Sequence, residues 1–216
     1  MPEMSLHNQL KDKIRLPRDL LEAEVWGFKA DIIRGDQVIE IQTGNFPAIR
    51  SKITRLLKGY SVTLIYPLTE HRVITRLDGE KQSKRSSPKR GRIEELFNEL
   101  IYMPTIVLNQ RFRLEVFFIW EEEILKNDGE GSWRRRKWSI EDRKLIKVTD
   151  IRIFEKPTDY LELLPNGMPQ DFGVKDLQKA SGISPVLARK MLYTLSKMGL
   201  LVEVGKKDRG KIYHIR

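Results

Sequence analysis

The sequence predicts an α/β fold in which a mixed sheet is flanked by helices. Three observations support this prediction. Near the N-terminus the expected elements follow the order helix, strand, strand, helix, strand, which typically builds a sheet covered by helices. Residues 111–154 have the composition of a long β-hairpin, and the chain after residue 170 changes to two helices followed by a basic hairpin. We therefore expect one larger α/β domain and one small C-terminal domain.

Composition limits the class of protein. The chain has 216 residues, and its hydrophobic content of 40% permits a buried core. No apolar run reaches the roughly eighteen residues of a membrane-spanning helix, and the first residues lack the pattern of a signal peptide. The sequence has no cysteine, which excludes disulfides, thiolate zinc sites and cysteine nucleophiles. We expect a cytoplasmic protein with no membrane partner.

The net charge of +10 comes from 40 Lys and Arg against 30 Asp and Glu. An excess of positive charge attracts polyanions. Nucleic acid is the commonest partner consistent with it, although an anionic membrane surface or a merely soluble basic protein has the same charge. The location of the cations has to decide between these readings.

The first elements are predicted from periodicity and turn residues. A helix is expected over residues 4–14, because apolar residues recur there with helical spacing and Ser5 can cap it. Residues 24–43 are expected to form two strands joined by a turn at residues 34–36. A second helix over residues 48–59, with Asn45 and Gly59 as caps, precedes a short strand over residues 61–66 that is covered on both faces.

Two acids are brought together by the predicted hairpin. Asp31 lies on the first strand and Glu40 on the second, and the tight turn between them places the two side chains close together. Acids in a sheet rich in Ile and Val are costly unless something compensates, and a hard divalent cation is one way to do so. The alternative is a surface hairpin whose polar residues face water.

Basic residues gather in residues 81–92, which contain no acid and are expected to form a loop. The loop precedes a helix predicted over residues 93–101, and a basic loop before a helix N-terminus suits phosphate binding. The alternative is a solvated loop. The candidate DNA-binding residues of this loop are Lys84, Arg85, Lys89, Arg90 and Arg92.

Two long strands are expected over residues 113–125 and 133–154. Four cations between Trp133 and Trp138 can grip a nucleic-acid strand by charge and stacking. The alternative is an exposed strand whose cations face Glu121 to Glu123 across the hairpin.

We expect a linker over residues 157–170 between a domain of residues 1–156 and a domain of residues 171–216. In the second domain Ser184 and Pro185 begin a helix, and the order helix, turn, helix, basic hairpin is that of a winged helix-turn-helix. The alternative use is protein contact, including formation of a homodimer. The candidate DNA-binding residues of this domain are Arg189, Lys190, Lys197, Lys206, Lys207 and Arg209. Thr194 is also expected to lie off the apolar stripe of the second helix.

One pattern in the sequence resembles the PD-(D/E)XK restriction-endonuclease-like superfamily. It consists of Asp31, a tight hairpin, Glu40-Ile41-Gln42, a helix and an apolar strand. The whole chain also resembles a family of uncharacterised prokaryotic proteins that join such a core to a C-terminal winged helix. The superfamily resemblance implies a restriction-endonuclease-like mixed sheet and a nuclease site that holds Mg²⁺ or Mn²⁺. The implied ligands are Asp31, Glu40 and the carbonyl of Ile41.

The resemblance has one departure. The superfamily usually has a lysine two residues after the glutamate, where this chain has Gln42. Glutamine can orient water but carries no charge and is a poor base. Lys52 on the following helix is the first candidate for the missing cation, and Arg50 is the second. An additional acid, which some members carry on the first helix, has Glu3, Glu22 and Glu24 as candidates, and a bulge at Gly27 would be needed to bring Glu24 to the site.

These expectations lead to a metal-dependent DNA phosphodiesterase targeted by a winged-helix module, with Asp31, Glu40, Gln42 and Lys52 as catalytic residues. The alternative is a non-catalytic nucleic-acid-binding or regulatory protein with a degenerate nuclease core, which Gln42 favours. A protein-interaction scaffold with incidental charge is the third reading. The sequence contains no Walker-type loop, dinucleotide-binding glycine motif or serine-hydrolase elbow. His7, His71 and His214 lack metal-ligand spacing and are expected to be ordinary polar residues.

Overall fold

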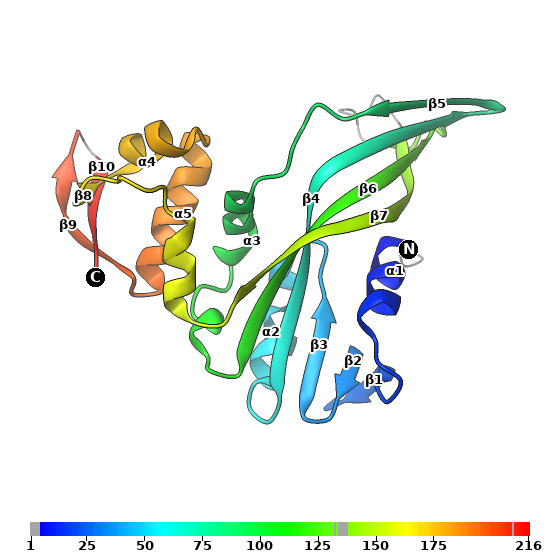
Figure 1. Ribbon diagram of the computed structural model, residues 1–216, viewed down its shortest axis with the longest axis horizontal. Coiled ribbons are helices and arrows are strands. Elements are labelled where there is room, and N and C mark those ends of the chain that lie inside the picture. The colour runs from blue at the N-terminus through cyan, green and yellow to red at the C-terminus, as the bar shows by residue number, and fades with distance from the viewer. Residues whose placement is uncertain (1–4, 132, 134–137, 209) are drawn as a thin grey trace.

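A computed structural model describes residues 5–131, 133, 138–208 and 210–216 of the protein. Within these residues seven strands form one mixed sheet in the order β1-β2-β3-β4-β6-β7, with β5 beside β4 (Figure 1). The predicted α/β class, with a large mixed sheet flanked by helices, is confirmed. The strands of this sheet are β1 (Leu20–Val25), β2 (Phe28–Arg34), β3 (Gln37–Ile41), β4 (Ser61–Asp78), β5 (Lys81–Ser86), β6 (Phe112–Lys126) and β7 (Ser139–Phe154).

Two strand pairs of the sheet are parallel. β3 runs parallel to β4, and β4 runs parallel to β6. A parallel pair needs a crossover connection, usually a helix. α2 (Phe46–Leu56) makes the crossover from β3 to β4. The crossover from β4 to β6 passes through β5 and then through two short helices, η1 (Ile93–Leu96) and α3 (Phe97–Leu100), and the 3-10 turn η2 (Ile106–Leu108).

Alternate residues of β3 face two different helices. Val38 belongs to the core cluster that contains Phe46 of α2. Ile39 belongs to a second cluster with Leu6 and Leu10 of α1 (Ser5–Ile14). Because successive side chains of a strand point to opposite faces, α1 and α2 cover opposite faces of the sheet. Glu40 therefore lies on the face that α2 covers.

The first predicted strand of the hairpin is wrong in one respect, because it is divided by an additional turn. β1 ends at Val25 and β2 begins at Phe28, and the two residues between them, Trp26 and Gly27, both have positive φ. Two such residues form the turn that matches the twist of a two-residue hairpin. The conformation costs Trp26 more than it would cost Gly, but its ring packs edge-to-face on Tyr60 with centroids 5.1 Å apart. Gly27 is therefore part of a turn and not a bulge.

Gly59 does not cap α2 as predicted. The helix ends at its C-cap Leu57. Asn45 occupies the N-cap position as predicted, but its side chain makes no capping hydrogen bond. A Cβ built on Gly59 would lie 2.3 Å from the Trp26 ring. Gly59 is required for close approach of the β1–β2 turn, a contact that joins two segments far apart in the sequence.

The predicted basic loop is partly a strand. Lys81–Ser86 forms β5, which pairs antiparallel with residues 73–78 of β4. The short strand expected at residues 61–66 is the first part of the 18-residue β4. Ser, Lys and Arg suggest a loop by composition, but on an edge strand they remain in water while the backbone pairs on one side. β4, β5, β6 and β7 together extend as an arm to the upper right of Figure 1.

The predicted long hairpin is present, since β6 and β7 pair antiparallel with three register irregularities. Trp133 is 82% exposed, whereas Trp138 lies against Arg76, whose guanidinium carbon is 5.3 Å from the ring centroid. The four cations predicted to bind nucleic acid between them lie outside the described residues. Glu123 pairs across the hairpin with Arg143.

The C-terminal segment packs on the same core as the sheet. Its elements are the 3-10 helix η4 (Pro157–Leu163), β8 (Asp171–Phe172), α4 (Val174–Ser181), α5 (Pro185–Lys197), β9 (Leu201–Lys207) and β10 (Gly210–Ile215). Part of the predicted linker is thus a helix, and its Tyr160 is buried against Phe154, with the rings stacked at 4.8 Å. The capping prediction for α5 is confirmed, because Ser184 Oγ accepts a hydrogen bond from the Leu187 amide at 3.2 Å. The prediction for Thr194 is wrong, because it is fully buried.

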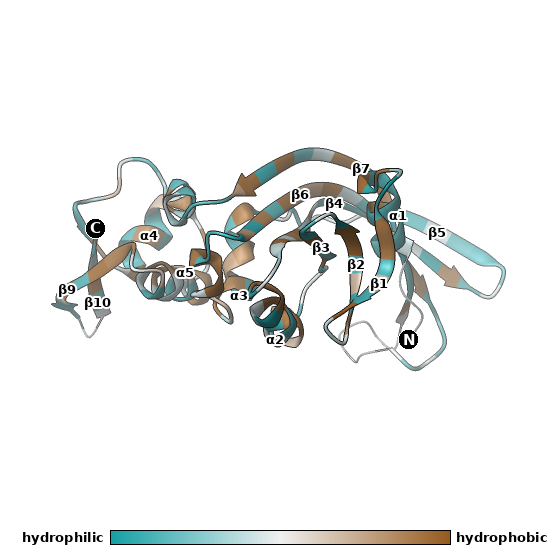
Figure 2. Ribbon diagram, turned by 90° about the horizontal axis from the view of Figure 1, so that it is seen from below, coloured by the Kyte–Doolittle hydropathy of each residue, from teal (hydrophilic) through white to brown (hydrophobic). Residues whose placement is uncertain are grey.

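Figure 2 shows the curved sheet with α2 and α3 on its inner side, and α4 and α5 beyond α3. Apolar residues of both parts belong to one continuous cluster, including Phe97 of α3 and Leu192 of α5. None of the described helices is both long enough and apolar enough to cross a membrane.

Tyr160→Phe should stabilise the protein. The Tyr160 hydroxyl is buried and has no hydrogen-bond partner among the described residues, and burial raises its pKa. Removing an unsatisfied buried hydroxyl while keeping the stacked ring should raise the free energy of unfolding by about 1 kcal/mol. Tyr160→Leu, the control, loses the stacked ring and should lower it by about 2 kcal/mol or more. Urea unfolding measures the free energy of unfolding of both variants. A Tyr160→Phe protein that is less stable than wild type would show that the buried hydroxyl has a hydrogen-bond partner.

Candidate functional site

The two acids meet where the pairing of β2 with β3 ends. The last pair in this direction is Ile32 with Ile39, so Asp31 and Glu40 are the next residues on each strand. At this point a side chain replaces the backbone ladder, because Asp31 Oδ2 accepts a hydrogen bond from the Ile41 amide at 2.8 Å. The predicted proximity of Asp31 to Glu40 is therefore present in the structure.

Glu40 is buried and is paired with a lysine of α2. The residue is 4% exposed, and its Oε2 lies 2.5 Å from Lys52 Nζ. Lys52 Nζ also donates to the Lys29 carbonyl of β2 at 2.6 Å. Lys52 thus reaches from the crossover helix to both strands of the hairpin. The second candidate cation, Arg50, is exposed on the outer side of the same helix.

Gln42 follows the end of β3 and turns into the loop. Its backbone N–H donates to the Ile65 carbonyl at 2.9 Å, which extends the parallel pairing of β3 with β4 by one residue. Its side-chain nitrogen donates to the Gly44 carbonyl. Neither interaction involves Asp31 or Glu40, so in this arrangement the carboxamide supports the loop that leads into α2.

His7 of α1 completes the site, although the sequence predicted an ordinary polar residue. Its Nε2 lies 3.2 Å from Asp31 Oδ2 and 3.1 Å from the Ile41 carbonyl oxygen. These are two of the three groups predicted to bind metal. His7 lies next to Leu6, which packs on the sheet, so the docking of α1 brings the imidazole to this edge. The helical stripe predicted this docking in outline, but no spacing in the sequence links His7 to Asp31.

The other predicted acids lie elsewhere. Glu22 accepts hydrogen bonds from Lys11, at 2.9 Å, and from Lys29. Glu24 is exposed on β1 and is opposite Lys29 in the hairpin. Glu3 lies outside the described residues. Glu24 and Asp31 were predicted to lie on the same strand. This prediction is wrong, because the Trp26–Gly27 turn places Glu24 on β1 and Asp31 on β2.

Electrostatics separates the two carboxylates. Burial and then the charge of Asp31 raise the pKa of Glu40 to about 7, against the opposing effect of Lys52. Burial also acts to raise the pKa of Asp31, but hydrogen bonds from His7 and the Ile41 amide outweigh it, so this pKa is lowered. The site therefore holds Asp31 as a carboxylate and leaves Glu40 close to its titration point near neutral pH.

The donor chemistry of the site fits a hard divalent cation in part. Asp31, Glu40 and the Ile41 carbonyl offer oxygen ligands. Glu40 Oε1 is buried and makes no hydrogen bond within the described part of the chain. A cation between the carboxylates would satisfy this oxygen and reduce their repulsion. Among the described residues, however, no three His, Asp or Glu side chains are already arranged as a metal cluster.

A polar hollow of about 180 Å³ lies just beyond the end of β3. Thr43 and Tyr66 line it, together with Arg72, Lys89 and Arg143. Buried Glu121 and Glu123 hold Arg72 at 2.6 and 3.3 Å, and Glu123 also holds Arg143. The hollow therefore extends the site with cations whose charges are largely balanced by acids.

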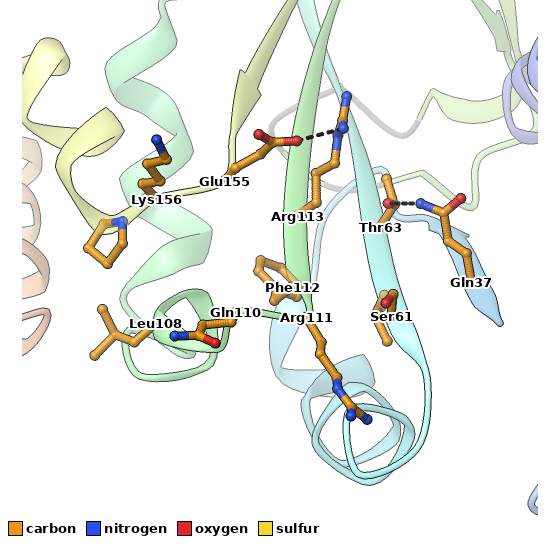
Figure 3. Close-up of a pocket in the computed structure, with 12 residues that line it drawn as sticks. Gln37, Ser61, Thr63, Leu108, Gln110, Arg111, Phe112, Arg113, Glu155 and Lys156 are labelled. Atoms are coloured by element: carbon orange, nitrogen blue, oxygen red, sulfur yellow. Dashed lines mark hydrogen bonds and ion pairs between the residues drawn. The ribbon is translucent and has the colours of Figure 1, made fainter.

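A pocket of about 630 Å³ lies near the opposite end of β3 (Figure 3). Its polar side chains bond to one another: Gln37 Nε2 donates to Thr63 Oγ1 at 2.8 Å, and Arg113 pairs with Glu155 at 2.6 Å. Gln37 shares the face of Ile39, which is opposite to that of Glu40. This pocket is therefore separate from the two acids.

The sequence matches a protein family, described as "Domain of unknown function (DUF8091)", over residues 4–155. The chain belongs to the DUF8091 family. The matched region contains the seven-stranded sheet, His7, both acids and Lys52. A protein of Treponema pallidum (strain Nichols) with the name "Uncharacterized protein" is 28% identical over 215 residues, which are 98% of this chain and 84% of that protein. No solved structure matches the chain.

In this DUF8091 chain most of the predicted DNA-binding residues at 81–92 have partners of their own. Lys84 pairs with Glu122 at 3.0 Å, Lys89 with Glu95 at 3.1 Å and Arg92 with Glu94 at 2.8 Å. Arg90 donates to the Ser87 carbonyl at 2.7 Å, and Arg85 is exposed on β5. The absence of acids within the segment therefore does not make it a free basic surface.

The predicted DNA-binding residues of the C-terminal segment differ in exposure. Arg189 and Lys197 are exposed on α5, and Lys206 and Lys207 are exposed on β9. Lys190 instead points toward the sheet domain, where Nζ donates to Asn98 Oδ1 at 2.9 Å. Lys190 was predicted to bind DNA together with the exposed cations, but its side chain lies where α5 packs against α3. Arg209 lies outside the described residues.

The pH dependence of stability tests the Glu40 environment. A pKa raised from 4.5 to about 7 means that between these values the folded protein binds a proton that the unfolded chain has released. This contribution to stability is fully present below pH 4.5 and is lost as the pH rises through 7. The stability of Glu40→Gln relative to wild type should therefore increase, by on the order of 3 kcal/mol, from about pH 4.5 to about pH 8.

Chemical unfolding at several pH values measures this difference. The control is Glu80→Gln, at an exposed carboxylate of the β4–β5 turn. Its unfolding free energy should stay within about 0.5 kcal/mol of the wild-type value, because substitution of an exposed side chain has a small effect. A Glu40→Gln difference that does not change with pH would show that Glu40 is not desolvated by its surroundings.

Proposed function

We propose that the protein is a metal-dependent phosphodiesterase that acts on DNA. The observation that carries this proposal is the convergence of Asp31, Glu40 and Lys52 from three elements at the end of β3. Two acids and a lysine at the point where a hairpin opens are suited to hydrolysis of a phosphodiester. The order of strands and crossover helix supports the restriction-endonuclease-like core that the sequence motif resembles.

Asp31, Glu40 and the Ile41 carbonyl would hold Mg²⁺ or Mn²⁺. When bound, the ion would lower the pKa of a water and stabilise charge on the phosphate. Glu40 Oε1 supports the assignment, because this buried oxygen makes no hydrogen bond within the described residues and could accept a cation. His7 now contacts the Ile41 carbonyl, so this oxygen becomes a ligand only if the imidazole moves.

Lys52 supplies the positive charge that Gln42 lacks. Its ammonium is held by Glu40 and the Lys29 carbonyl, which direct it toward the acids rather than into solvent. A charge fixed in a buried position stabilises a developing oxyanion more than a mobile surface lysine does. Gln42, whose side chain bonds to the Gly44 carbonyl, shapes the loop and is assigned no proton transfer.

His7 acts through Asp31 as a positioning residue. The hydrogen bond from its imidazole orients the carboxylate, in the way that second-shell groups orient metal ligands. The Ile41 amide fixes the same oxygen from the other side. Together they keep Asp31 ionised and leave its Oδ1, which has no hydrogen bond from the described residues, available for a ligand.

The C-terminal segment would serve as a winged-helix DNA-binding module. Residues 171–216 contain ten Lys and Arg against four Asp and Glu, so this fifth of the chain carries more than half of the net charge. Exposed Arg189 and Lys197 on α5, with Lys206 and Lys207 on β9, would contact phosphates. DNA binding by this module would deliver the strand to the acids of the core.

The second candidate function is DNA binding without cleavage. Its supporting observation is that the potential ligands already have internal partners. Lys52 neutralises Glu40, and His7 contacts both Asp31 and the Ile41 carbonyl. A degenerate site closed in this manner would stabilise the sheet and leave the basic residues to bind DNA.

Incubation of the protein with Mg²⁺ or Mn²⁺ and supercoiled, linear, single-stranded and branched DNA tests the proposal. Asp31→Ala and Glu40→Ala should each lower the cleavage rate by roughly 10²-fold or more. Lys52→Met should lower it by roughly 10²-fold, with Lys52→Arg retaining part of the rate because the charge remains.

Glu80→Gln is the matched surface control and should cleave like wild type. Cleavage that survives both Asp31→Ala and Glu40→Ala would exclude the assigned site. Binding without cleavage of every substrate would favour the second function.

A further inference from the structure

α2 and the turn that follows it have a basic outer face. The chain contains no Asp or Glu from Ile41 to Thr69, and α2 lies in this stretch. Arg50, Arg55 and Lys58 are exposed. Within the described part of the protein none of these three cations forms an ion pair, although Arg55 lies over the Phe28 ring at 5.7 Å.

The exposed residues form one continuous surface. Together with Ser51 and Thr54, which lie between them, they are connected by spacings of three and four, which places them on one side of the helix and the turn after it. A shallow groove of about 420 Å³ follows them, and its lining includes two hydroxyl side chains, Ser51 and Thr54. The groove from Arg50 to Lys58 is roughly 12 Å long at the rise of a helix, which spans about three to four phosphates along one strand of a duplex.

The same helix also reaches the candidate site. Lys52 projects from its inner side to Glu40, while Arg50 and Arg55 lie two and three residues away on the outer side. A strand bound in the groove therefore passes beside the helix that supplies the catalytic cation. The cations at 81–92 lack this advantage, because Lys84, Lys89 and Arg92 would first have to leave their acid partners.

We propose that the outer face of α2 binds the phosphodiester backbone of the DNA that enters the site. The inference rests on the proposed function for the identity of the ligand. Three unpaired cations and two hydroxyls match successive phosphates by charge and hydrogen bonding. The contacts read no base, so the surface contributes affinity and placement rather than sequence specificity.

Two variants of equal net charge test this surface. Arg50→Gln/Arg55→Gln/Lys58→Gln removes the unpaired cations, and Lys84→Gln/Lys89→Gln/Arg92→Gln removes three cations that have acid partners. Fluorescence anisotropy with labelled duplex and single-stranded DNA, in EDTA over a series of KCl concentrations, measures affinity without cleavage. Because Arg55 contacts Phe28, thermal unfolding is compared as well, and Arg50→Gln/Lys58→Gln provides a variant that keeps this contact.

We expect the α2 triple variant to weaken DNA binding about tenfold or more and to reduce the slope of log affinity against log salt by about two to three. The double variant should show about two-thirds of this change in slope. The triple variant at 84, 89 and 92 should change the slope by less than half as much. The expected pattern, found in folded proteins, supports the α2 surface even if wild type never cleaves DNA, in which case only the phosphodiesterase proposal fails.

Equal changes in the two triple variants would overturn the inference while leaving the cleavage test of Asp31 and Glu40 unaffected. Absence of salt-dependent DNA binding by wild type would also overturn it. A third overturning result would be tighter binding to anionic phospholipid vesicles than to DNA at the same phosphate concentration.

Discussion

The parallel pairing of β3 with β4 is the constraint on which the site depends. Parallel neighbours cannot be joined by a tight turn, so the chain must leave β3 after Ile41 and cross the sheet through α2. This crossover places Lys52 above Glu40 and exposes the end of β3. The same departure interrupts the ladder with β2, where side-chain bonds of Asp31 and His7 replace it. The parallel pairing of β3 with β4 therefore determines both the crossover through α2 and the position of the site.

The sequence predicts what local rules determine. Gly35-Asp36 and the period of two indicate a hairpin that brings Asp31 to Glu40, and the apolar stripe of the following helix indicates that Lys52 can reach back. His7 could not be predicted, because its place depends on how α1 docks on the distant β7. The Trp26–Gly27 turn was also missed, since the bulky residue at positive φ is stabilised there by contacts with the distant residues Tyr60 and Gly59. β5 was missed because a polar, Lys-rich edge strand has the composition of a loop.

The charges are likewise only partly predictable from the sequence. The composition gives the net charge, but the positions of the side chains determine which cations remain available to a ligand. Lys84, Lys89 and Arg92 look free in the sequence and are paired across strands and turns. In the sequence, Arg50, Arg55 and Lys58 resemble the solvated side of an amphipathic helix. Lys190, on a helix that also carries exposed cations, is used to hold α5 against α3.

The docking of α1 has a consequence for synthesis of the chain. Ser5 bonds to Asp142, a partner 137 residues later, and Gln9 accepts a hydrogen bond from the Leu145 amide. His7 lies between these two anchors. As the chain leaves the ribosome, β2 and β3 emerge with both acids long before β7 exists to receive α1. The two anchors on β7 therefore form only after nearly three-quarters of the protein has been made, and a chain interrupted before β7 carries the acids of the site and α1 without these anchors.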